Sequence, residues 1–182
     1  MRFWFGGEEP EPVQRRRDQA IAARFEPLVT EAAQGKLASW ADSPRRRLSL
    51  ILLLDQLPRN IYRGTPRAFA SDQRALGLTL SGIQSGADAA LAAVERIFFY
   101  MPLQHAESLE AQDESVAAYR RLLEESPSDL RPAFAAVLQH AEAHRSAIER
   151  FGRFPHRNRI LGRPTTPQEQ QYLSADQRPD VT

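Results

Sequence analysis

Apolar residues recur at helical spacing along most of the chain, and no strand-like alternation interrupts them. The strongest run, LSLILLL from Leu48 to Leu54, is apolar on every side, which predicts a central, fully buried helix. Ser43 and Pro44 are suited to cap and start this helix. Pro58 is expected to end it, because a residue that precedes proline disfavours helical geometry.

The same spacing, together with capping residues, predicts the remaining helices. They are expected over about residues 15–33, 66–86, 88–100, 103–125 and 130–151, with a short last helix after Thr166. Leu80 and Leu109 are expected on buried stripes, and the sequence TPQE from Thr166 to Glu169 is a capping box. We therefore predict an all-α fold of about seven helices and no sheet, with a single domain over residues 1–174 and a loose tail at 175–182.

Composition narrows the range of functions. The 182 residues carry a formal net charge of +1, and every basic residue except Lys36 is arginine, a bias that a GC-rich genome explains. This balance does not favour a nucleic-acid partner. The absence of cysteine excludes disulfides and thiolate sites, and no apolar run approaches the ~20 residues of a membrane helix. Without a secretory signal, phosphate loop or dinucleotide glycine pattern, we expect a cytoplasmic protein with no membrane partner and no cofactor.

Polar residues interrupt the apolar stripes in four places, where functional or strained sites are expected. In the first, Asp55 and Gln56 continue the stripe of the central helix, with Asp55 four positions after Ile51. A buried carboxylate needs a cation or several donors, because leaving it unpaired costs several kcal/mol. Arg59 is the nearest cation, so an internal Asp55–Arg59 pair that fixes the turn is the structural alternative to a ligand site.

The second place is His105, in the segment FFYMPLQHAESLEAQ. We expect it at a helix start, on the same buried stripe as Leu109 and Gln112. Glu107 would then lie in the first helical turn, where the helix dipole favours a carboxylate. The dipole accounts for Glu107 without any chemistry, but it does not account for a buried histidine.

The third place is the pair His140 and His144, four residues apart on one predicted helix. That spacing is compatible with a metal, but the order His-Glu-x-x-His of the zincin helix is absent. A packed His144 beside a surface His140 is therefore the favoured interpretation, and no metal site is predicted.

The fourth place is the segment RFGRFPHRNRILGR, which runs from Arg150 to Arg163 and contains His156 but no acid. Arginine forks match the geometry of phosphates and carboxylates, although a solvated basic loop would have the same composition. A second turn, with Arg59, Arg63 and Arg67, also lacks acids. If both turns fold onto one end of the helices, they would form a cationic pocket.

Several segments resemble a single bacterial family. FWFG, AAQGKLASW, LLLDQLPRNIYRGTPRAFASD, IFFYMPLQHAESLEAQ and FGRFPHRNRILGR occur here in the order found in the family designated domain of unknown function 924. The resemblance covers nearly the whole chain and implies a tetratricopeptide-like (TPR-like) array of antiparallel helices, with no established activity. The sequence departs from the family where GEEPEPVQRR replaces an expected tryptophan-containing stretch. If that stretch covers a pocket in relatives, the pocket here would be more open.

The segments that carry the resemblance coincide with the polar interruptions, and together they define the predicted site. In the main hypothesis the protein binds a small carboxylate or phosphate, with hydrolase-type catalysis as an extension. The candidate catalytic residues are His105, His156 and Asp55; the candidate ligand-binding residues are Gln56, Arg59, Asn60, Glu107, Arg153, Arg157 and Asn158. The alternative is a TPR-like interaction scaffold that binds a peptide, with arginines holding its C-terminal carboxylate.

Overall fold

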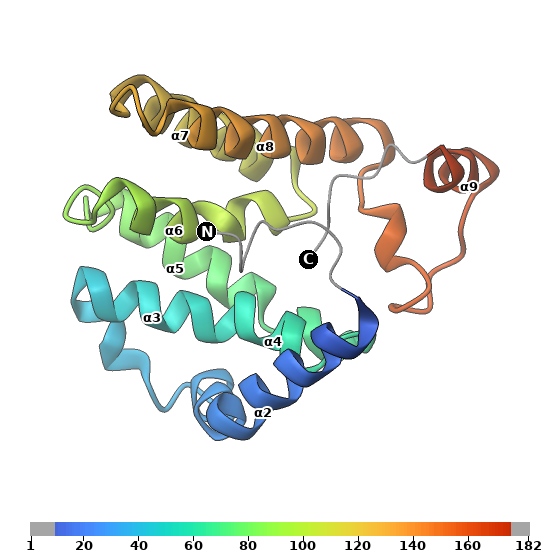
Figure 1. The fold of residues 1–182 in the computed structure, drawn as a ribbon, viewed down its shortest axis with the longest axis horizontal. Coiled ribbons are helices and arrows are strands. Elements are labelled where there is room, and N and C mark those ends of the chain that lie inside the picture. Colours follow the sequence, from blue (N-terminus) through green and yellow to red (C-terminus); the bar gives the residue numbers. More distant parts are fainter. Residues whose placement is uncertain (1–9, 176–182) are drawn as a thin grey trace.

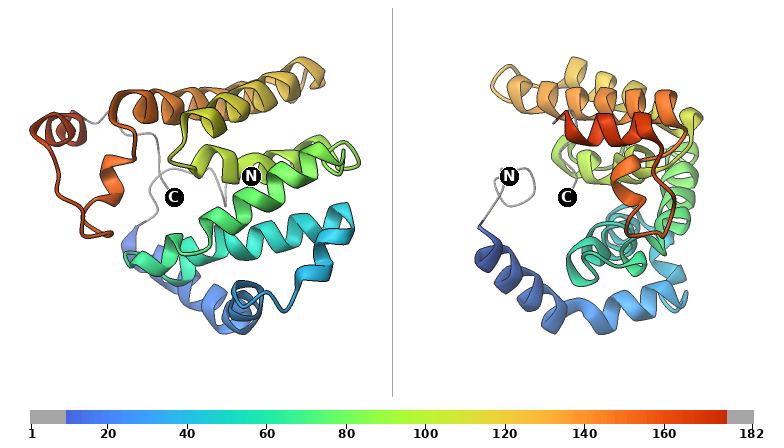
Figure 2. Two further views of the ribbon diagram at one scale, coloured as in Figure 1. Left: turned by 180° about the vertical axis from the view of Figure 1, so that it is seen from behind. Right: turned by 90° about the vertical axis from the view of Figure 1, so that its right-hand side faces the viewer.

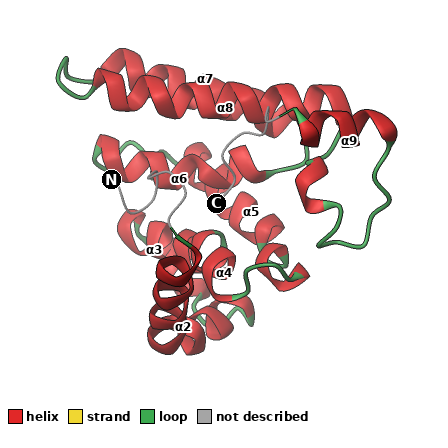
Figure 3. Cartoon of the chain, turned by 45° about the vertical axis from the view of Figure 1, so that its right-hand side comes forward, coloured by secondary structure: helices red, strands yellow, loops and turns green. Residues whose placement is uncertain are grey.

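The computed structural model describes residues 10–175, and every regular element within this range is helical (Figures 1 and 3). There are eight α-helices and three short 3₁₀-helices in the described range. In chain order they are α2 (Glu11–Ala33), η1 (Ala38–Asp42), α3 (Pro44–Leu54), α4 (Gln56–Ile61), η2 (Pro66–Phe69), α5 (Asp72–Gln84), α6 (Ala93–His105), α7 (Leu109–Glu125), α8 (Arg131–Phe151), η3 (Pro155–Arg157) and α9 (Pro167–Ser174). The all-α prediction is confirmed for this range. The FWFG segment and the predicted tail beyond residue 175 lie outside it.

The helices are stacked in tiers. Figure 1 shows α7 and α8 along one side, α5 and α6 next, then α3 and α4, with α2 on the opposite side. One hydrophobic core lies between α3, α5, α6, α7 and α8, and a second lies between α2, α3, α4 and α5. Within residues 10–175, none of the helices combines the length and the apolar character that crossing a bilayer requires.

The predicted central helix is buried as expected, but it is divided in two. Ile51 and Leu54 are fully buried. The helix α3 ends at Leu54, before Pro58, and α4 begins at Gln56. Pro58 therefore lies in the first turn of a new helix, where its missing N–H is tolerated, and it does not end the preceding one. The division adds one helix to the predicted number and leaves Asp55 at the junction.

The boundary between α6 and α7 also differs from the prediction. The helix α6 continues through Pro102 to His105, so His105 lies at the end of α6 and not at the start of the next helix. Ser108 is the N-cap of α7 and accepts a hydrogen bond from the N–H of Ala111. Glu107 consequently lies in the linker, outside the first turn of α7 where it was expected.

Two leucines predicted to be buried are exposed. Leu109 is the first residue of α7 and is 41% exposed, although it precedes the buried Gln112 and Val116 by three and seven positions. Leu80 is 44% exposed because α5 packs through Thr79 and Gly82, the neighbouring face of the helix.

The segment after Thr65 forms only the 3₁₀-helix η2 before α5 begins at Asp72. Gly82 lies inside α5 and does not close it. A Cβ atom at Gly82 would be 2.5 Å from Cζ of Phe99 and 2.9 Å from Cδ of Arg47, so this glycine permits close packing of α5 against α6 and α3.

The C-terminal third agrees with the sequence prediction. The helix α8 ends at Gly152, whose φ of 68° is the left-handed conformation that favours glycine. The predicted capping box is present at the start of α9, with Thr166 and Glu169 each bonded to the other's backbone. A third, small hydrophobic cluster joins α8 and α9 through Phe154 and Tyr172. Figures 1 and 2 show the segment between α8 and α9 passing beside the ends of α4 and α6.

Candidate functional site

The centre of the candidate site is a pair formed by Asp55 and His105. Nδ1 of His105 lies 2.8 Å from Oδ1 and 2.9 Å from Oδ2 of Asp55, and both side chains are buried. The break between α3 and α4 presents the carboxylate, and the end of α6 presents the imidazole. Gln56 donates to Oδ2 of the same carboxylate at 2.7 Å.

The protonation states of this pair follow from its surroundings. Burial alone would raise the pKa of Asp55, but the charge of Arg59 and the contacts with His105 outweigh it and hold this pKa well below its ordinary value. Burial, reinforced by Arg59, lowers the pKa of His105 against the opposing effect of Asp55. The histidine is therefore neutral at pH 7, with its proton on Nδ1, facing the ionised carboxylate. Nε2 has no hydrogen-bond partner among residues 10–175 and is left as a free base.

Two arginines contact a second carboxylate, that of Asp72 at the start of α5. Arg59 forms a fork with Asp72 through two bonds of 3.0 Å and donates to the backbone oxygen of Asp55 at 2.5 Å. Arg157, eighty-five positions after Asp72, reaches Oδ2 of the same carboxylate at 3.4 Å. The helix α4 and the segment that follows α8 are thus brought together at the start of α5.

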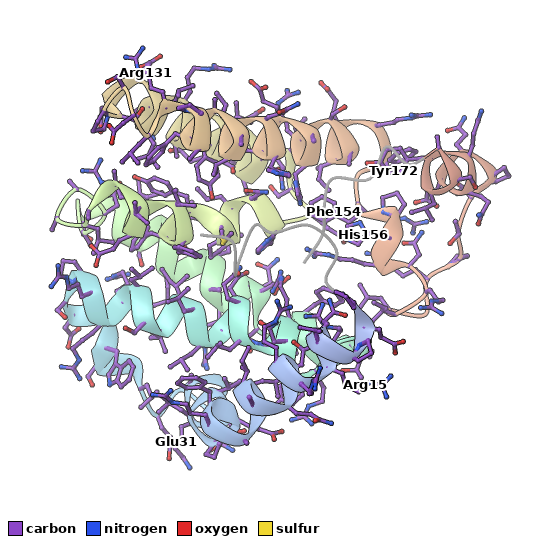
Figure 4. All side chains as sticks on the ribbon, in the orientation of Figure 1. Arg15, Glu31, Arg131, Phe154, His156 and Tyr172 are labelled. Carbon is purple, nitrogen blue, oxygen red and sulfur yellow. The ribbon has the colours of Figure 1, made fainter. Side chains whose placement is uncertain are left out.

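Arg157 is held between aromatic side chains. Its Cζ lies 4.7 Å from the centroid of Phe69 and 4.6 Å from that of Phe154, distances at which a cation is attracted to a ring face. The Phe154 ring also contacts His144 and His156, with centroids 5.4 and 5.5 Å away. Figure 4 places Phe154 and His156 on the segment between α8 and α9, on the side that faces the other helices.

The two histidines of α8 differ in burial, and His140 is only partly buried. His144 is buried, and its Nδ1 lies 2.8 Å from the backbone oxygen of His140, to which it donates. Burial lowers the pKa of His144 to about 3, so the ring is neutral at pH 7. Its centroid is 6.4 Å from that of His105. The side chain of His144 therefore packs behind the candidate site, as the sequence predicts.

In the folded protein, acids pair with residues of both arginine-rich turns. This corrects the prediction of an uncompensated cationic pocket. Asp18 on α2 accepts from Asn60 at 3.1 Å and from Arg63 at 2.6 Å. Glu169 on α9 accepts two hydrogen bonds from Arg153, at 2.7 and 2.9 Å. These acids are distant along the chain, so the local absence of acids in each turn was misleading.

The segment between α8 and α9 is tied to the α6–α7 linker by Glu107. Its carboxylate accepts from the N–H of Phe154 at 2.8 Å and from Arg163 at 2.7 and 3.0 Å. Burial is outweighed by the bonds from Arg163 and Phe154, which lower the pKa of Glu107. Arg163 also donates to Asn158 at 3.0 Å, and Asn158 is fully buried. These residues position the segment that carries His156 and Arg157.

Two atoms of this segment are buried without any partner among the described residues, Nε2 of His156 and Nε of Arg157. Burial, assisted by Arg157, lowers the pKa of His156 to about 3, so its ring is neutral. Burial and the charge of Arg59 lower the pKa of Arg157 to about 10, which leaves its guanidinium charged at pH 7. Among the residues predicted from sequence, these two and His105 retain unused hydrogen-bonding capacity.

Sequence reasoning missed Asp72, Phe69 and Phe154 as members of the site. Asp72 looks like an ordinary acid in the first turn of a helix, and the phenylalanines look like ordinary core residues. The available signal was an imbalance of charge, because Arg157 needed an acid that the segment from Arg150 to Arg163 does not supply. It indicated that such an acid exists, but it did not show which one.

The fold and the site define an all-α protein whose polar centre is assembled from four separate segments of the chain. The chain belongs to the family described as bacterial protein of unknown function (DUF924), which matches residues 1–177. A solved structure of a protein of unknown function from Agrobacterium tumefaciens is similar to it, with 38% sequence identity and a TM-score of 0.80. The similarity covers 94% of this chain and 88% of that protein. No curated protein matches the sequence.

Proposed function

We propose that this protein binds a small anionic ligand at Arg157 and that the Asp55–His105 pair supplies a base beside it. The state of the Arg157 guanidinium carries the proposal. The side chain is 5% exposed, its one hydrogen-bond contact with a described residue is the 3.4 Å approach to Asp72, and its Nε is buried without a partner. A buried donor without an acceptor costs about 1–3 kcal/mol, and an anion that accepts from it removes this cost.

The contacts that the other arginines already make support Arg157 as the one that binds the ligand. Arg59 already shares both oxygens of Asp72 and contacts Asp55, and Arg153 is forked onto Glu169. We assign these two arginines, together with Gln56, Asn60, Glu107 and Asn158, to positioning the site.

The site lies near the surface on one side. The side chain of Asp72 is 17% exposed, and Phe69 and His156 are partly exposed. A ligand approaching Arg157 from this side meets guanidinium and imidazole groups before it meets the apolar core.

His105 gives the site its chemistry in this proposal. Its Nε2 accepts a proton from a water molecule or from a hydroxyl group of the ligand, and Asp55 stabilises the imidazolium that forms. A water activated in this way would add to an ester or amide carbonyl of a ligand held by Arg157, with the electrons of the carbonyl double bond moving to its oxygen. When that double bond forms again, the bond to the leaving group breaks and His105 returns the proton to that group, which completes a hydrolase-type reaction. Proton transfer of this kind typically contributes 10²–10⁴-fold to a rate.

The binding proposal is tested by titrating the protein with acetate and with inorganic phosphate at constant ionic strength. We expect saturable shifts of the Arg157 Nε–H and His105 ring signals in ¹H–¹⁵N spectra with at least one of the two probes. Arg157→Gln should abolish the response, whereas Arg145→Gln should retain it, because Arg145 is already paired with Asp113 on α7 and Glu149 on α8. If neither probe shifts these signals in the unmodified protein, the proposal is wrong, whatever the stability of the variants.

A TPR-like interaction scaffold is the second candidate function. The helices α7 and α8 pair in opposite directions, as the ion pairs Arg120–Glu142 and Arg145–Asp113 indicate, and a groove of about 410 Å³ lies over them. Its lining consists of Asp113, Val116, Ala117, Arg120, Glu142 and Arg145. A peptide with paired charges would exchange partners with these ion pairs. A saturable fluorescence-polarisation signal with such a peptide that Arg120→Ala removes would support this function, and no response across acidic, basic and mixed peptides would oppose it.

A further inference from the structure

We infer that the anion bound at Arg157 is a carboxylate and not a phosphate. This inference rests on the proposed function and specifies its ligand class. It follows from two independent features of the site, the shape of the space around the guanidinium and the charge that surrounds it.

The shape of the site is set by the two phenylalanines. The rings of Phe69 and Phe154 both approach Cζ of Arg157 within 5 Å, at 4.7 and 4.6 Å. Guanidinium groups stack on aromatic faces, and stacked rings leave the planar edge of the group as the place where an acceptor fits. Nη1 is already directed at Asp72, while Nε is buried without a partner among residues 10–175. The edge that includes Nε is therefore the one with an unused donor.

A planar acceptor suits this edge. A carboxylate lies in the plane of the guanidinium and accepts two parallel hydrogen bonds. Its two oxygens and one carbon are no thicker than the guanidinium itself, so they fit between flanking rings. A tetrahedral phosphate carries two further oxygens out of that plane, towards Phe69 and Phe154, whose rings offer no hydrogen-bond donor. Those oxygens would lose their hydration without compensation.

Charge favours the same choice. The inner cluster holds two cations, Arg59 and Arg157, and two carboxylates, Asp55 and Asp72, so its formal charge is balanced while His105 is neutral. A carboxylate adds one negative charge, which a single proton on His105 balances. A phosphate near pH 7 adds up to two, and the second remains uncompensated in a buried setting where isolated charge is expensive.

The same balance of charge links ligand binding to proton uptake. An added anion near His105 stabilises the imidazolium, so the pKa of His105 rises when the ligand binds. The proton enters at Nε2, since Nδ1 already faces Asp55. Binding of a carboxylate should therefore take up close to one proton per ligand at pH values between the free and the bound pKa of this histidine.

The experiment compares acetate, butyrate and inorganic phosphate on the full chain at pH 7 and constant ionic strength, by the same NMR titration. We expect both carboxylates to bind and phosphate to bind at least about tenfold more weakly. Phe69→Ala should narrow this difference by opening one face of the guanidinium, while Phe25→Ala, on α2, should leave it unchanged. Calorimetry in two buffers of different ionisation enthalpy should show proton uptake with acetate.

The possible outcomes separate the two proposals. Phosphate binding as tightly as acetate would overturn the carboxylate inference and leave the anion site of the proposed function intact. Binding of neither would overturn both. Carboxylate binding without proton uptake would contradict the charge argument, and a Phe69→Ala variant with unchanged discrimination would contradict the argument from shape.

Discussion

Nδ1 of His105 lies 2.8 Å from Oδ1 of Asp55, a residue fifty positions earlier in the chain. The two are brought together because α3 stops at Leu54 and α6 continues to His105, which places both side chains at the ends of neighbouring helices. The contact joins an ionised carboxylate to a neutral ring and so determines which ring nitrogen carries the proton. The pair is therefore expected to contribute to stability, and in the proposed function it also supplies the base.

The tautomer of His105 is the first prediction. At pH 7, long-range ¹H–¹⁵N spectra should show a protonated Nδ1 and an unprotonated Nε2, because Asp55 only accepts hydrogen bonds. The signal should be assigned by its loss in His105→Gln. A protonated Nε2 in the ligand-free protein would contradict the assignment of this nitrogen as a base.

Removing the charge of Asp55 should destabilise the protein strongly. Asp55→Asn removes the charge that faces the buried His105 and one of the two carboxylates that contact the buried Arg59, and breaking a buried pair in this way typically costs about 3–5 kcal/mol. The control is Asp113→Asn, the same change in an ion pair whose carboxylate is 55% exposed, for which we expect less than about 1 kcal/mol. Urea unfolding followed by circular dichroism measures both. Similar free energies of unfolding for the two variants would show that the Asp55 pair is not a major source of stability.

Stability should fall as the pH is lowered below about 6.5. The pKa values of His144 and His156 are lowered from 6.5 to about 3, so in this range the unfolded chain takes up protons that the folded protein does not. The unfolded state then binds more protons, and the free energy of unfolding decreases with falling pH, by up to about 1.4 kcal/mol per pH unit for each histidine. Below about pH 4, Asp55 adds to the loss, because its folded pKa is also lowered.

The histidine contribution is measured by urea unfolding at pH 7, 6 and 5. His144→Gln removes one titrating group, so its stability should depend less steeply on pH even if its absolute stability is lower. The circular dichroism spectrum at pH 7 controls for folding. An unchanged slope in this variant would mean that His144 does not contribute to the acid sensitivity.

Two glycines of α5 should respond in opposite directions to replacement by alanine. Gly82→Ala forces a methyl group against Phe99 and Arg47, and overpacking of this kind costs about 1–3 kcal/mol. Gly77→Ala meets nothing within 4 Å and should stabilise the helix by about 0.5–1 kcal/mol. Melting temperatures of the two variants decide the matter, and a stabilised Gly82→Ala variant would show that α5 and α6 are not packed closely at this point.

The sequence indicated the buried polar residues Asp55 and His105 better than it indicated the acids that pair with the arginines. Asp55 and His105 were found because each interrupts an apolar stripe, a signal that burial itself produces. Two helix boundaries were predicted wrongly, at Pro58 and at Pro102. Pro58 lies in the first turn of a new helix and Pro102 lies inside a helix, and the sequence alone does not distinguish these cases from a proline that ends a helix.

The acids that pair with the arginines could not be predicted, for a different reason. Asp18, Asp72 and Glu169 lie on three different helices, and which of them meets Arg63, Arg157 or Arg153 depends on how those helices pack. Local composition records only that a turn contains cations. It does not show which acids the tertiary structure brings to that turn, so the charge balance of the site depends on how the helices pack.

Phe154 is shared by two environments, since it packs in the small cluster with Tyr172 and Ile148 and also lies beside the guanidinium of Arg157. The last helix is consequently more than a terminal support. If α9 were removed by proteolysis or by shortening of the gene, the Phe154 ring would lose its contact with Tyr172. Arg157 would then lose the fixed position of the ring beside it, although no residue next to Arg157 had been altered.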